Sequence, residues 1–359
     1  MWSIGLPFRL LCKVGLEIAC ARNKNRYTTL ANVLLGSTII LPSLAITLSF
    51  TIITLSVYPE IVFLYSQKEE QHYSFSGSWG SEGGEDGQLM RPHSIDVDSS
   101  GNVYVADSGN SRIQKFTSDG KFITKWGEWG DESGQFKTLH DVAVDPLGKY
   151  VYTIEIDNYR VQQFTSDGKF VAKWGYEKTG GHGALRNPHQ VAVDSTGNHY
   201  LPDKDGSEVL KFDSVGSIIQ KYGSNGTGNG EFKTPHGIAV DSMDNVYVTD
   251  MDNYRIQKFD SDGNFITKWG SKGDQDGQFS NVTPGIDVDP NGEVYVIDKV
   301  RANIQKFDSD GNFITKWGSK GDQDGQFSDP EDIAVNPLTG VVYVTDTGNS
   351  RVQMFDITK

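Results

Sequence analysis

The hydrophobic positions of residues 73–359 fall in short runs of five to seven residues rather than at helical spacing. Valine, isoleucine, phenylalanine and tyrosine dominate these runs, and glycine-containing and Asx-containing turns separate them, as in GNVYVAD, NSRIQKF and GKFITKWG. Such runs are typical of β-strands joined by tight turns. One longer apolar stretch, 27–59, departs from this pattern. The pattern therefore predicts an all-β region preceded by a separate apolar segment.

The short runs come in groups of four, and the group recurs six times. The segment PHSIDVD at 92–98 returns as LHDVAVD, PHQVAVD, PHGIAVD, PGIDVD and PEDIAVN, and the last residues of these segments lie 47, 49, 47, 48 and 47 positions apart. Three further β-prone runs follow the first run in each of the first five units. Four strands in a repeat of this length are typical of one blade of a β-propeller.

The two ends of the repeat region complement each other. The sixth unit stops after its third run, RVQMF at 351–355, whereas YSFSGSWG at 73–80 matches the pattern of a fourth run. A strand at 73–80 that completes the last blade would remove the open sheet edge and close the ring. We therefore predict a six-bladed β-propeller over 73–359.

The repeat unit, with G-x-F, P-x-x-I-A-V-D, G-x-V-Y-V-A-D and N-x-R-I-Q-K-F in order, resembles the NHL repeat in all six copies. Similar propellers occur in tripartite-motif ubiquitin ligases, in the peptidyl-hydroxyglycine amidating lyase and in membrane-anchored microbial surface proteins. The resemblance implies the fold but does not choose among these functions. The chain has only two cysteines, Cys12 and Cys20, so it carries no RING or B-box set and intrinsic ubiquitin-ligase activity is not supported.

The apolar stretch 27–59 is an uncharged run of 33 residues, long enough to cross a bilayer as a tilted helix. It exceeds the core of a cleavable signal peptide, so we expect one uncleaved signal-anchor. A second membrane segment within 4–20 stays open. The basic residues of 1–26 favour a cytoplasmic N-terminus, which places the linker 60–72 and the propeller outside, at the cell surface. The sequence thus predicts a single-pass membrane protein with an extracytoplasmic propeller.

Net charge bears on the class of partner. The whole chain carries −14, and residues 71–359 hold 27 Lys and Arg against 43 Asp and Glu, or −16. A nucleic-acid-binding surface needs an excess of positive charge, so no nucleic-acid partner is expected. A rigid disc with variable loops is a generic recognition platform, and a protein, peptide or glycan ligand is the expected partner.

The main candidate site is one repeat position just before the first strand of each unit. Units one to four place His93, His140, His189 and His236 there, unit six places Glu331, and unit five has lost a residue and has no ligand. First strands line the channel of a propeller, so these side chains should ring one channel mouth. They are candidate ligands for a divalent metal such as zinc. The alternative is that each histidine simply hydrogen-bonds a neighbouring loop.

The resemblance to the amidating lyase bears on this choice. Its zinc-binding histidines occupy the same Pro-His position in alternate blades, which implicates His93 and His189, but the third alternate blade is the defective unit five. The lyase also has an arginine one residue, and a tyrosine two residues, after the aspartate that ends strand two. In this chain the first of these positions holds no arginine, and the second holds no tyrosine. The residues at the first position are Ser108, Ile156, Lys204, Met251, Lys299 and Thr347, and those at the second are Gly109, Asp157, Asp205, Asp252, Val300 and Gly348. A binding platform is therefore the predicted function, with a metal-dependent lyase or hydrolase as the alternative, and enzymatic activity stays open.

Other recurrent residues are expected to be structural. An acid that ends strand two faces an arginine that opens strand three in four units, and this pair should hold the hairpin together. The pairs are Asp107 with Arg112, Glu155 with Arg160, Asp250 with Arg255, and Asp346 with Arg351. The tryptophans of the fourth runs should pack between blades. The Asp-rich turns at 273–277 and 321–325 lack the ligand pattern of a calcium loop and are expected to be turns.

Overall fold

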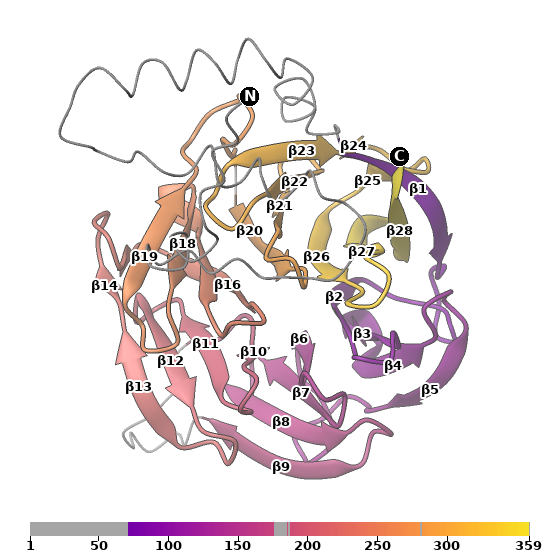
Figure 1. The fold of residues 1–359 in the computed structure, drawn as a ribbon. Helices are drawn as coiled ribbons and strands as arrows, with labels where there is room; N and C mark the ends of the chain where they lie inside the picture. The colour runs from indigo at the N-terminus through magenta and orange to yellow at the C-terminus, as the bar shows by residue number, and fades with distance from the viewer. Residues whose placement is uncertain (1–70, 176–184, 186, 281, 359) are drawn as a thin grey trace, which may run out of the picture. The chain divides into compact units, whose positions relative to one another are not determined.

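The computed structural model describes residues 71–175, 185, 187–280 and 282–358. In this part of the chain, six four-stranded antiparallel sheets surround a central axis as the blades of a propeller (Figure 1). Each blade is a meander in which consecutive strands pair, so the first strand lies next to the axis and the fourth strand at the rim. The predicted all-β fold with six blades is confirmed.

The strands of the blades follow the predicted runs closely. Blade one consists of β2 (Pro92–Val97), β3 (Val103–Asp107), β4 (Arg112–Phe116) and β5 (Phe122–Trp126). Blade two consists of β6 (Leu139–Val144), β7 (Tyr150–Glu155), β8 (Arg160–Thr165) and β9 (Phe170–Gly175). Blade three consists of β10 (Ala192–Val193), β11 (His199–Asp203), β12 (Glu208–Phe212) and β13 (Ile218–Tyr222). Blade four consists of β16 (Pro235–Val240), β17 (Val246–Asp250), β18 (Arg255–Phe259) and β19 (Phe265–Trp269). Blade five consists of β20 (Val282–Val288), β21 (Val294–Asp298), β22 (Asn303–Phe307) and β23 (Phe313–Trp317). Blade six consists of β26 (Pro330–Val335), β27 (Val342–Asp346), β28 (Arg351–Thr358) and β1 (His72–Trp79).

Shorter elements lie in the connections. Two parallel two-stranded pairs occur between blades, β14 (Ser224–Asn225) with β15 (Glu231–Phe232), and β24 (Ser319–Lys320) with β25 (Gln326–Phe327). Single 3₁₀ turns connect strands two and three in three blades, η2 (Ser108–Asn110), η3 (Met251–Asn253) and η4 (Thr347–Asn349). These connections lie at the end of the disc where the first strands begin.

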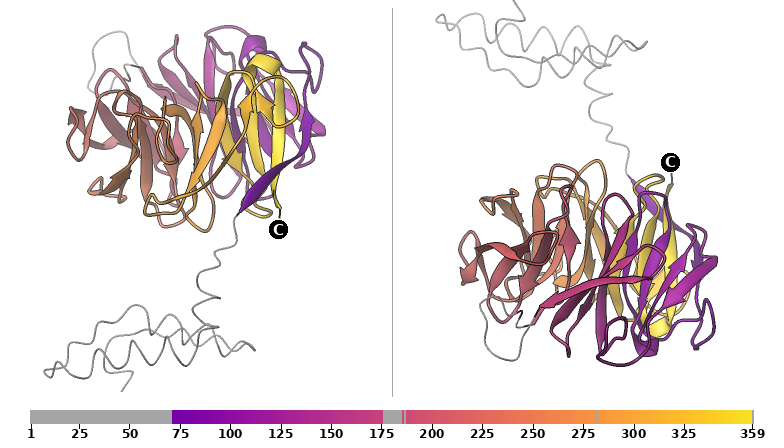
Figure 2. Two further views of the ribbon diagram at one scale, coloured as in Figure 1. Left: turned by 90° about the horizontal axis from the view of Figure 1, so that it is seen from above. Right: turned by 90° about the horizontal axis from the view of Figure 1, so that it is seen from below.

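The ring is closed by its N-terminal strand. β1 pairs antiparallel with β28, from His72 opposite Thr358 to Trp79 opposite Val352, and completes the sheet β1-β28-β27-β26. Figure 2 shows β1 beside the C-terminal strand. The predicted strand at 73–80 is thus confirmed. Every strand of the six blades finds its partners within 71–358, so residues 71–359 contain the whole closed ring.

Aromatic residues of the fourth strands pack between blades, as predicted. Trp126 of β5 lies 6.3 Å from Tyr104 of its own blade and 6.0 Å from Phe164 of the next, measured between ring centroids. Gly168, in the turn before β9 with a φ of +86°, lies against the indole, and a Cβ there would come within 2.6 Å of the ring. The glycine of this turn is therefore required both by its backbone conformation and by the neighbouring tryptophan.

The acid–arginine pairs have the predicted structural role. Arg112 Nε lies 2.7 Å from Asp107 Oδ2, and the other three arginines make the same contact with their acids at 2.6–2.8 Å. Arg112 also donates to the carbonyls of Gly84, Glu85 and Gln88 in the preceding connection. Each pair thus fastens a hairpin to the loop that leads into its blade.

The predicted membrane span, 27–59, lies outside the residues that the structure describes. Within the described ranges, no helix is long and apolar enough to cross a bilayer. The anchor and its topology stay predictions.

Candidate functional site in the central channel

The four histidines of the repeat position come together at one mouth of the channel. Ring centroids are 3.9 Å apart for His93 and His140, 4.5 Å for His140 and His189, and 4.0 Å for His189 and His236. His140 Nδ1 lies 2.9 Å from the carbonyl oxygen of His189, and His189 Nδ1 lies 3.2 Å from His140 Nε2. The imidazoles therefore contact one another across four blades, and we call them the histidine cluster.

Glu331 joins the cluster at one end and is held there by a lysine. Its Oε1 lies 3.9 Å from His93 Nε2, and it accepts a hydrogen bond from Lys299, which also pairs with Asp329 at 2.9 Å. Lys299 comes from unit five, the unit that has no candidate ligand at the repeat position. The lysine ammonium thus lies beside the channel mouth in the unit that has no candidate metal ligand. The sequence did not predict this position for Lys299.

The histidines are neutral at ordinary pH because burial removes water from them. Burial lowers the pKa of His93 and of His189 to about 3, and it lowers the pKa of His140 and of His236 well below the ordinary value. Nearby positive charge, including that of Lys299 at His93, acts in the same direction. Neutral imidazoles expose nitrogen lone pairs and accept hydrogen bonds or bind metals.

The cluster has the donor chemistry of a metal site but not its arrangement. Among the described residues, no group of three or more histidine, cysteine, aspartate or glutamate side chains is placed to hold a metal ion. His140 and His189 use their nitrogens to bond each other and a neighbouring carbonyl, which agrees with the structural alternative. His236 Nδ1, however, is buried and has no hydrogen-bond partner in the described part of the chain. Metal binding by these residues stays a prediction.

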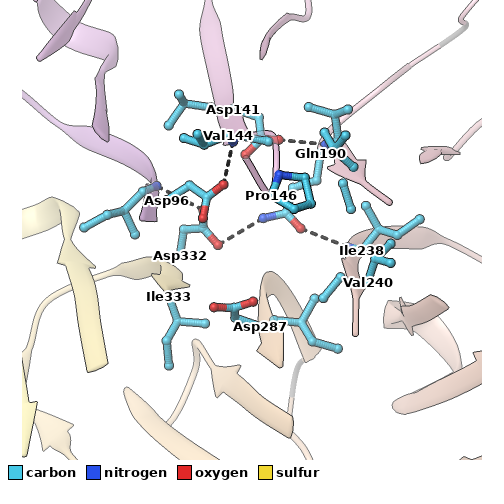
Figure 3. A pocket seen from close by; sticks show the side chains of 18 residues that line it. Asp96, Asp141, Val144, Pro146, Gln190, Ile238, Val240, Asp287, Asp332 and Ile333 are labelled. Atoms are coloured by element: carbon cyan, nitrogen blue, oxygen red, sulfur yellow. Dashed lines mark hydrogen bonds between the residues drawn. The ribbon is translucent and has the colours of Figure 1, made fainter. Parts of the chain in front are cut away.

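Further along the first strands from the histidine positions, these strands enclose a cavity of about 170 Å³, whose lining side chains are shown in Figure 3. The first strands line it, and Pro146, which follows β6, lies at its far end. Its polar lining consists of Asp96, Asp141, Gln190, Asp287 and Asp332. Sequence reasoning missed these carboxyls. For Asp96 and Asp287 the signal was in the repeat itself, because IDVD replaces IAVD in units one and five, whereas Asp141 and Asp332 directly follow His140 and Glu331.

Each of these carboxyls connects its own blade to the next one. Asp96 Oδ2 accepts from the amide of Val144 at 2.6 Å, Asp141 Oδ2 from that of Val191 at 2.7 Å, and Asp287 Oδ2 from that of Val335 at 2.7 Å. The first strand is the inner edge of its sheet, so its outward amides lack a strand partner. Side chains of the preceding blade satisfy these amides.

Burial also weakens the acidity of this lining. It raises the pKa of Asp141 to about 6 and that of Asp287 to about 7, and it raises the pKa of Asp96 and of Asp332 well above the ordinary value. Desolvation is the main cause, and the negative charge of neighbouring aspartates adds to it at Asp96 and Asp332. The cavity therefore carries less negative charge near neutral pH than four ordinary carboxylates would, which suits an inter-blade fastening.

The rim of the histidine mouth varies from blade to blade. The residue that follows the acid of strand two is Ser108, Ile156, Lys204, Met251, Lys299 or Thr347 in blades one to six. Lys204 and Lys299 are close enough to lower the pKa of His140. The acid itself recurs in every blade. Residues that hold the blade thus repeat, whereas residues at the rim of the mouth differ.

Comparison with known families finds the NHL repeat at three places, residues 89–116, 232–259 and 327–355. These stretches coincide with blades one, four and six. The repeat identity inferred from the sequence is therefore confirmed.

Two curated relatives match this chain over about the length of one repeat unit. Protein lin-41 of Caenorhabditis elegans is 52% identical over 48 residues, and E3 ubiquitin-protein ligase TRIM71 of Bos taurus is 51% identical over 45 residues. These matches cover 13% and 12% of this chain and only 4% and 5% of the relatives. The similarity is thus confined to the repeat.

Solved structures share the propeller fold at low identity. A protein of unknown function from Bacteroides thetaiotaomicron has a TM-score of 0.61 at 18% identity, covering 80% of this chain and 77% of its own. A gluconolactonase from Xanthomonas campestris has 0.56 at 14%, covering 81% and 90%, and virginiamycin B lyase from Staphylococcus aureus has 0.52 at 14%, covering 80% and 88%. At these identities the likeness concerns the fold alone.

Proposed function

We propose that this NHL-repeat propeller is a binding platform that holds a protein, peptide or glycan at the mouth of the histidine cluster. The observation that carries the proposal is the contrast between the six rim positions and the rest of the repeat. Five residue types occupy these six equivalent positions, whereas the strands and the acid that ends strand two recur in every blade. A ring of differing side chains on a repeated frame is expected where a non-symmetric ligand is recognised.

The construction of the ring supports this function. The rim residues lie on a rigid frame, which the closed ring of strands, the buried acid–arginine pairs and the inter-blade carboxyls hold together. Binding a ligand there therefore costs little conformational entropy in the protein. NHL propellers commonly serve as scaffolds for protein interaction. The charge of −16 over residues 71–359 opposes a nucleic-acid ligand.

A selection experiment tests the proposal. Residues 71–359 are panned against peptide-display and glycan libraries, and the dissociation constants of the selected ligands are measured on three proteins. The mouth variant carries Lys204→Ser and Met251→Ser, since blade one already uses serine there. The control carries Ile123→Thr and Ile266→Thr on the outer strands. If the ligand binds at the mouth of the histidine cluster, the mouth variant should bind at least tenfold more weakly and the control less than twofold more weakly than the wild type. Equal affinities of all three proteins would contradict binding at the mouth.

A metal-dependent lyase or hydrolase is the second candidate, favoured by the neutral imidazoles and by the unpartnered Nδ1 of His236. If zinc binds, His93, His140, His189, His236 and Glu331 would hold it, and it would supply Lewis-acid chemistry at the mouth. Elemental analysis of the purified propeller separates the two candidates. One equivalent of zinc that is lost in a His140→Gln, His236→Gln variant would support the metal site, and the absence of metal after zinc dialysis would remove it.

We also propose that 27–59 anchors the propeller outside the cytoplasmic membrane. The supporting observations are the length of the uncharged run and the basic residues before it. Protease treatment of intact cells is the test. Digestion of the propeller before lysis is expected, and survival until lysis would reverse the topology.

A further inference from the structure

The face opposite the histidine cluster carries three large apolar side chains in water. Leu147, Met243 and Leu338 are 80%, 72% and 67% exposed. All three occupy the same position of the turn between strands one and two, in blades two, four and six. The other three blades place Ser100, Thr196 and Asn291 there. Apolar and polar residues thus alternate around the ring at one turn position.

The fold does not require these apolar residues. In five of the six blades, the side chain two positions before accepts the backbone amide of the variable residue, and in blade two Asp145 accepts from Lys149 and Tyr150 instead. Asp241 Oδ1 accepts from Met243 at 2.9 Å, Asn336 Oδ1 from Leu338 at 3.0 Å, and Asp98 Oδ1 from Ser100 at 2.9 Å. The turn therefore forms equally with leucine, methionine or serine, and the apolar side chains must serve something other than folding.

The three residues surround the axis. Pro146, next to Leu147, lines the axial cavity together with Val144 and Val240, the last residues of two first strands. The turns of neighbouring blades are also connected, since Ser195 donates from its amide and hydroxyl to the carboxylate of Asp244, at 2.9 and 2.8 Å. Leu147, Met243 and Leu338 thus form a triad around the channel opening at this face, which we call the apolar triad.

The turns between strands three and four lie on the same face and make it acidic. In blades one and two, each turn pairs an aspartate with a lysine, Asp119 with Lys121 and Asp167 with Lys169. In blades three to five, these turns hold no lysine or arginine. They carry Asp213, Asp260, Asp262, Asp308 and Asp310. Blades three to five therefore give this face an excess of negative charge, although Lys211 and Lys258 reach the carbonyls of Ser261 and Ser309 in two of these turns.

We propose that this face docks a basic amphipathic peptide segment of a partner protein. Its apolar side chains contact the triad, and its lysine or arginine side chains face the aspartates of blades three to five. Charge complementarity selects this occupant, because nucleic acids and anionic membranes carry the sign that the face repels. The proposal extends the binding function to a second face and does not depend on the histidine mouth.

Fluorescence anisotropy with two labelled peptides tests the proposal on residues 71–359. One peptide alternates leucines and lysines at helical spacing, and the other has glutamate in place of every lysine. The lysine peptide should bind at least tenfold more tightly, and its affinity should fall as salt rises. The triad variant Leu147→Ser, Met243→Thr, Leu338→Asn should weaken this binding at least tenfold. An Asp262→Asn, Asp310→Asn variant should weaken it several-fold.

The control is a triple variant of the outer strands, Ile123→Thr, Ile219→Thr and Ile266→Thr, whose isoleucines are 44–53% exposed. It should change the affinity less than twofold. Other blades already use the residues introduced in the triad variant, so its melting temperature should match that of the wild type. Equal binding of both peptides, full affinity of the triad variant, or an equal loss in the outer-strand control would each overturn the proposal. The mouth variant Lys204→Ser, Met251→Ser should bind the peptide normally, so this result is separable from the fate of the proposed function.

Discussion

Asp332 of the last blade accepts a hydrogen bond from the backbone amide of Ile95 in the first blade, at 3.1 Å between Oδ2 and N. The same carboxyl accepts from Gln190 Nε2 at 3.0 Å, across the channel. The ring is thus closed twice, at the rim by the pairing of β1 with β28 and at the axis by this side chain. At this inner closure, Thr345 and Thr347 of the sixth unit also donate to the carbonyls of His93 and Pro92.

Replacing Asp332 should therefore loosen the ring. Asp332→Ala leaves the amide of Ile95 without its acceptor, and an unsatisfied buried amide costs about 1–3 kcal/mol. The free energy of unfolding in urea should fall by that amount, whereas Asp332→Asn, which keeps an acceptor oxygen, should lose less. Unchanged stability of the alanine variant would mean that the other contacts between blades six and one close the propeller without Asp332.

Asp287 should make stability depend on pH in the direction opposite to an ordinary carboxylate. Burial raises its pKa from 3.8 to about 7, so the folded protein binds this proton more tightly than the unfolded chain. Its contribution is fully present below pH 3.8 and is lost as pH rises to 7. Asp287→Ala introduces the alanine that blades two, three, four and six have at this position. The free energy of unfolding of the wild type minus that of the variant should be larger at pH 4.5 than at pH 7.5. A difference that grows with pH would contradict the raised pKa.

The histidine cluster should act in the opposite sense. His93 and His189 have their pKa lowered to about 3, below the unfolded value of 6.5, so the unfolded chain binds these protons more readily. Stability should be complete above pH 6.5 and should decline as pH falls toward 3. Thermal melting of His189→Gln between pH 7.5 and 4.5 should show a smaller decline than wild type. An identical decline in both proteins would assign the acid sensitivity elsewhere.

Arg112 should be more important for stability than any exposed ion pair. Arg112→Ala leaves buried Asp107 without its cation and removes one hydrogen-bond donor from each of three loop carbonyls. Removing one partner of a buried pair costs about 3–5 kcal/mol. Urea denaturation should detect this loss, and Lys121→Ala, which removes a lysine from an exposed pair, should be indistinguishable from wild type. Equal effects of the two substitutions would refute the proposal that Arg112 stabilises the blade by fastening its hairpin to the preceding loop.

The repeat pattern predicted the parts of the molecule that depend on position within a unit. The strand order, the N-terminal strand of the last blade, the Asp107–Arg112 type of pair and the equivalence of the four histidines all follow from period and register. The contacts between units do not. A repeat position does not say that His189 bonds His140, or that Lys299 of the unit without a candidate ligand reaches Glu331 in the next.

The axial carboxyls escaped prediction for a related reason. Asp96 and Asp287 stand where four other units have alanine, and in the sequence they resemble ordinary polar substitutions. Only the placement of neighbouring blades shows that each accepts an amide of the following first strand. Their role is a property of the ring rather than of the unit.

The central claim is that a ligand is held at the histidine mouth, and photo-crosslinking tests it most directly. A benzophenone side chain is introduced into residues 71–359 in place of Met251 at the mouth, or of Ile266 at the outer rim, and each protein is irradiated with a ligand selected by panning. The account predicts efficient crosslinking from position 251 and background levels from position 266. Equal crosslinking from both positions, or crosslinking from position 266 alone, would contradict it.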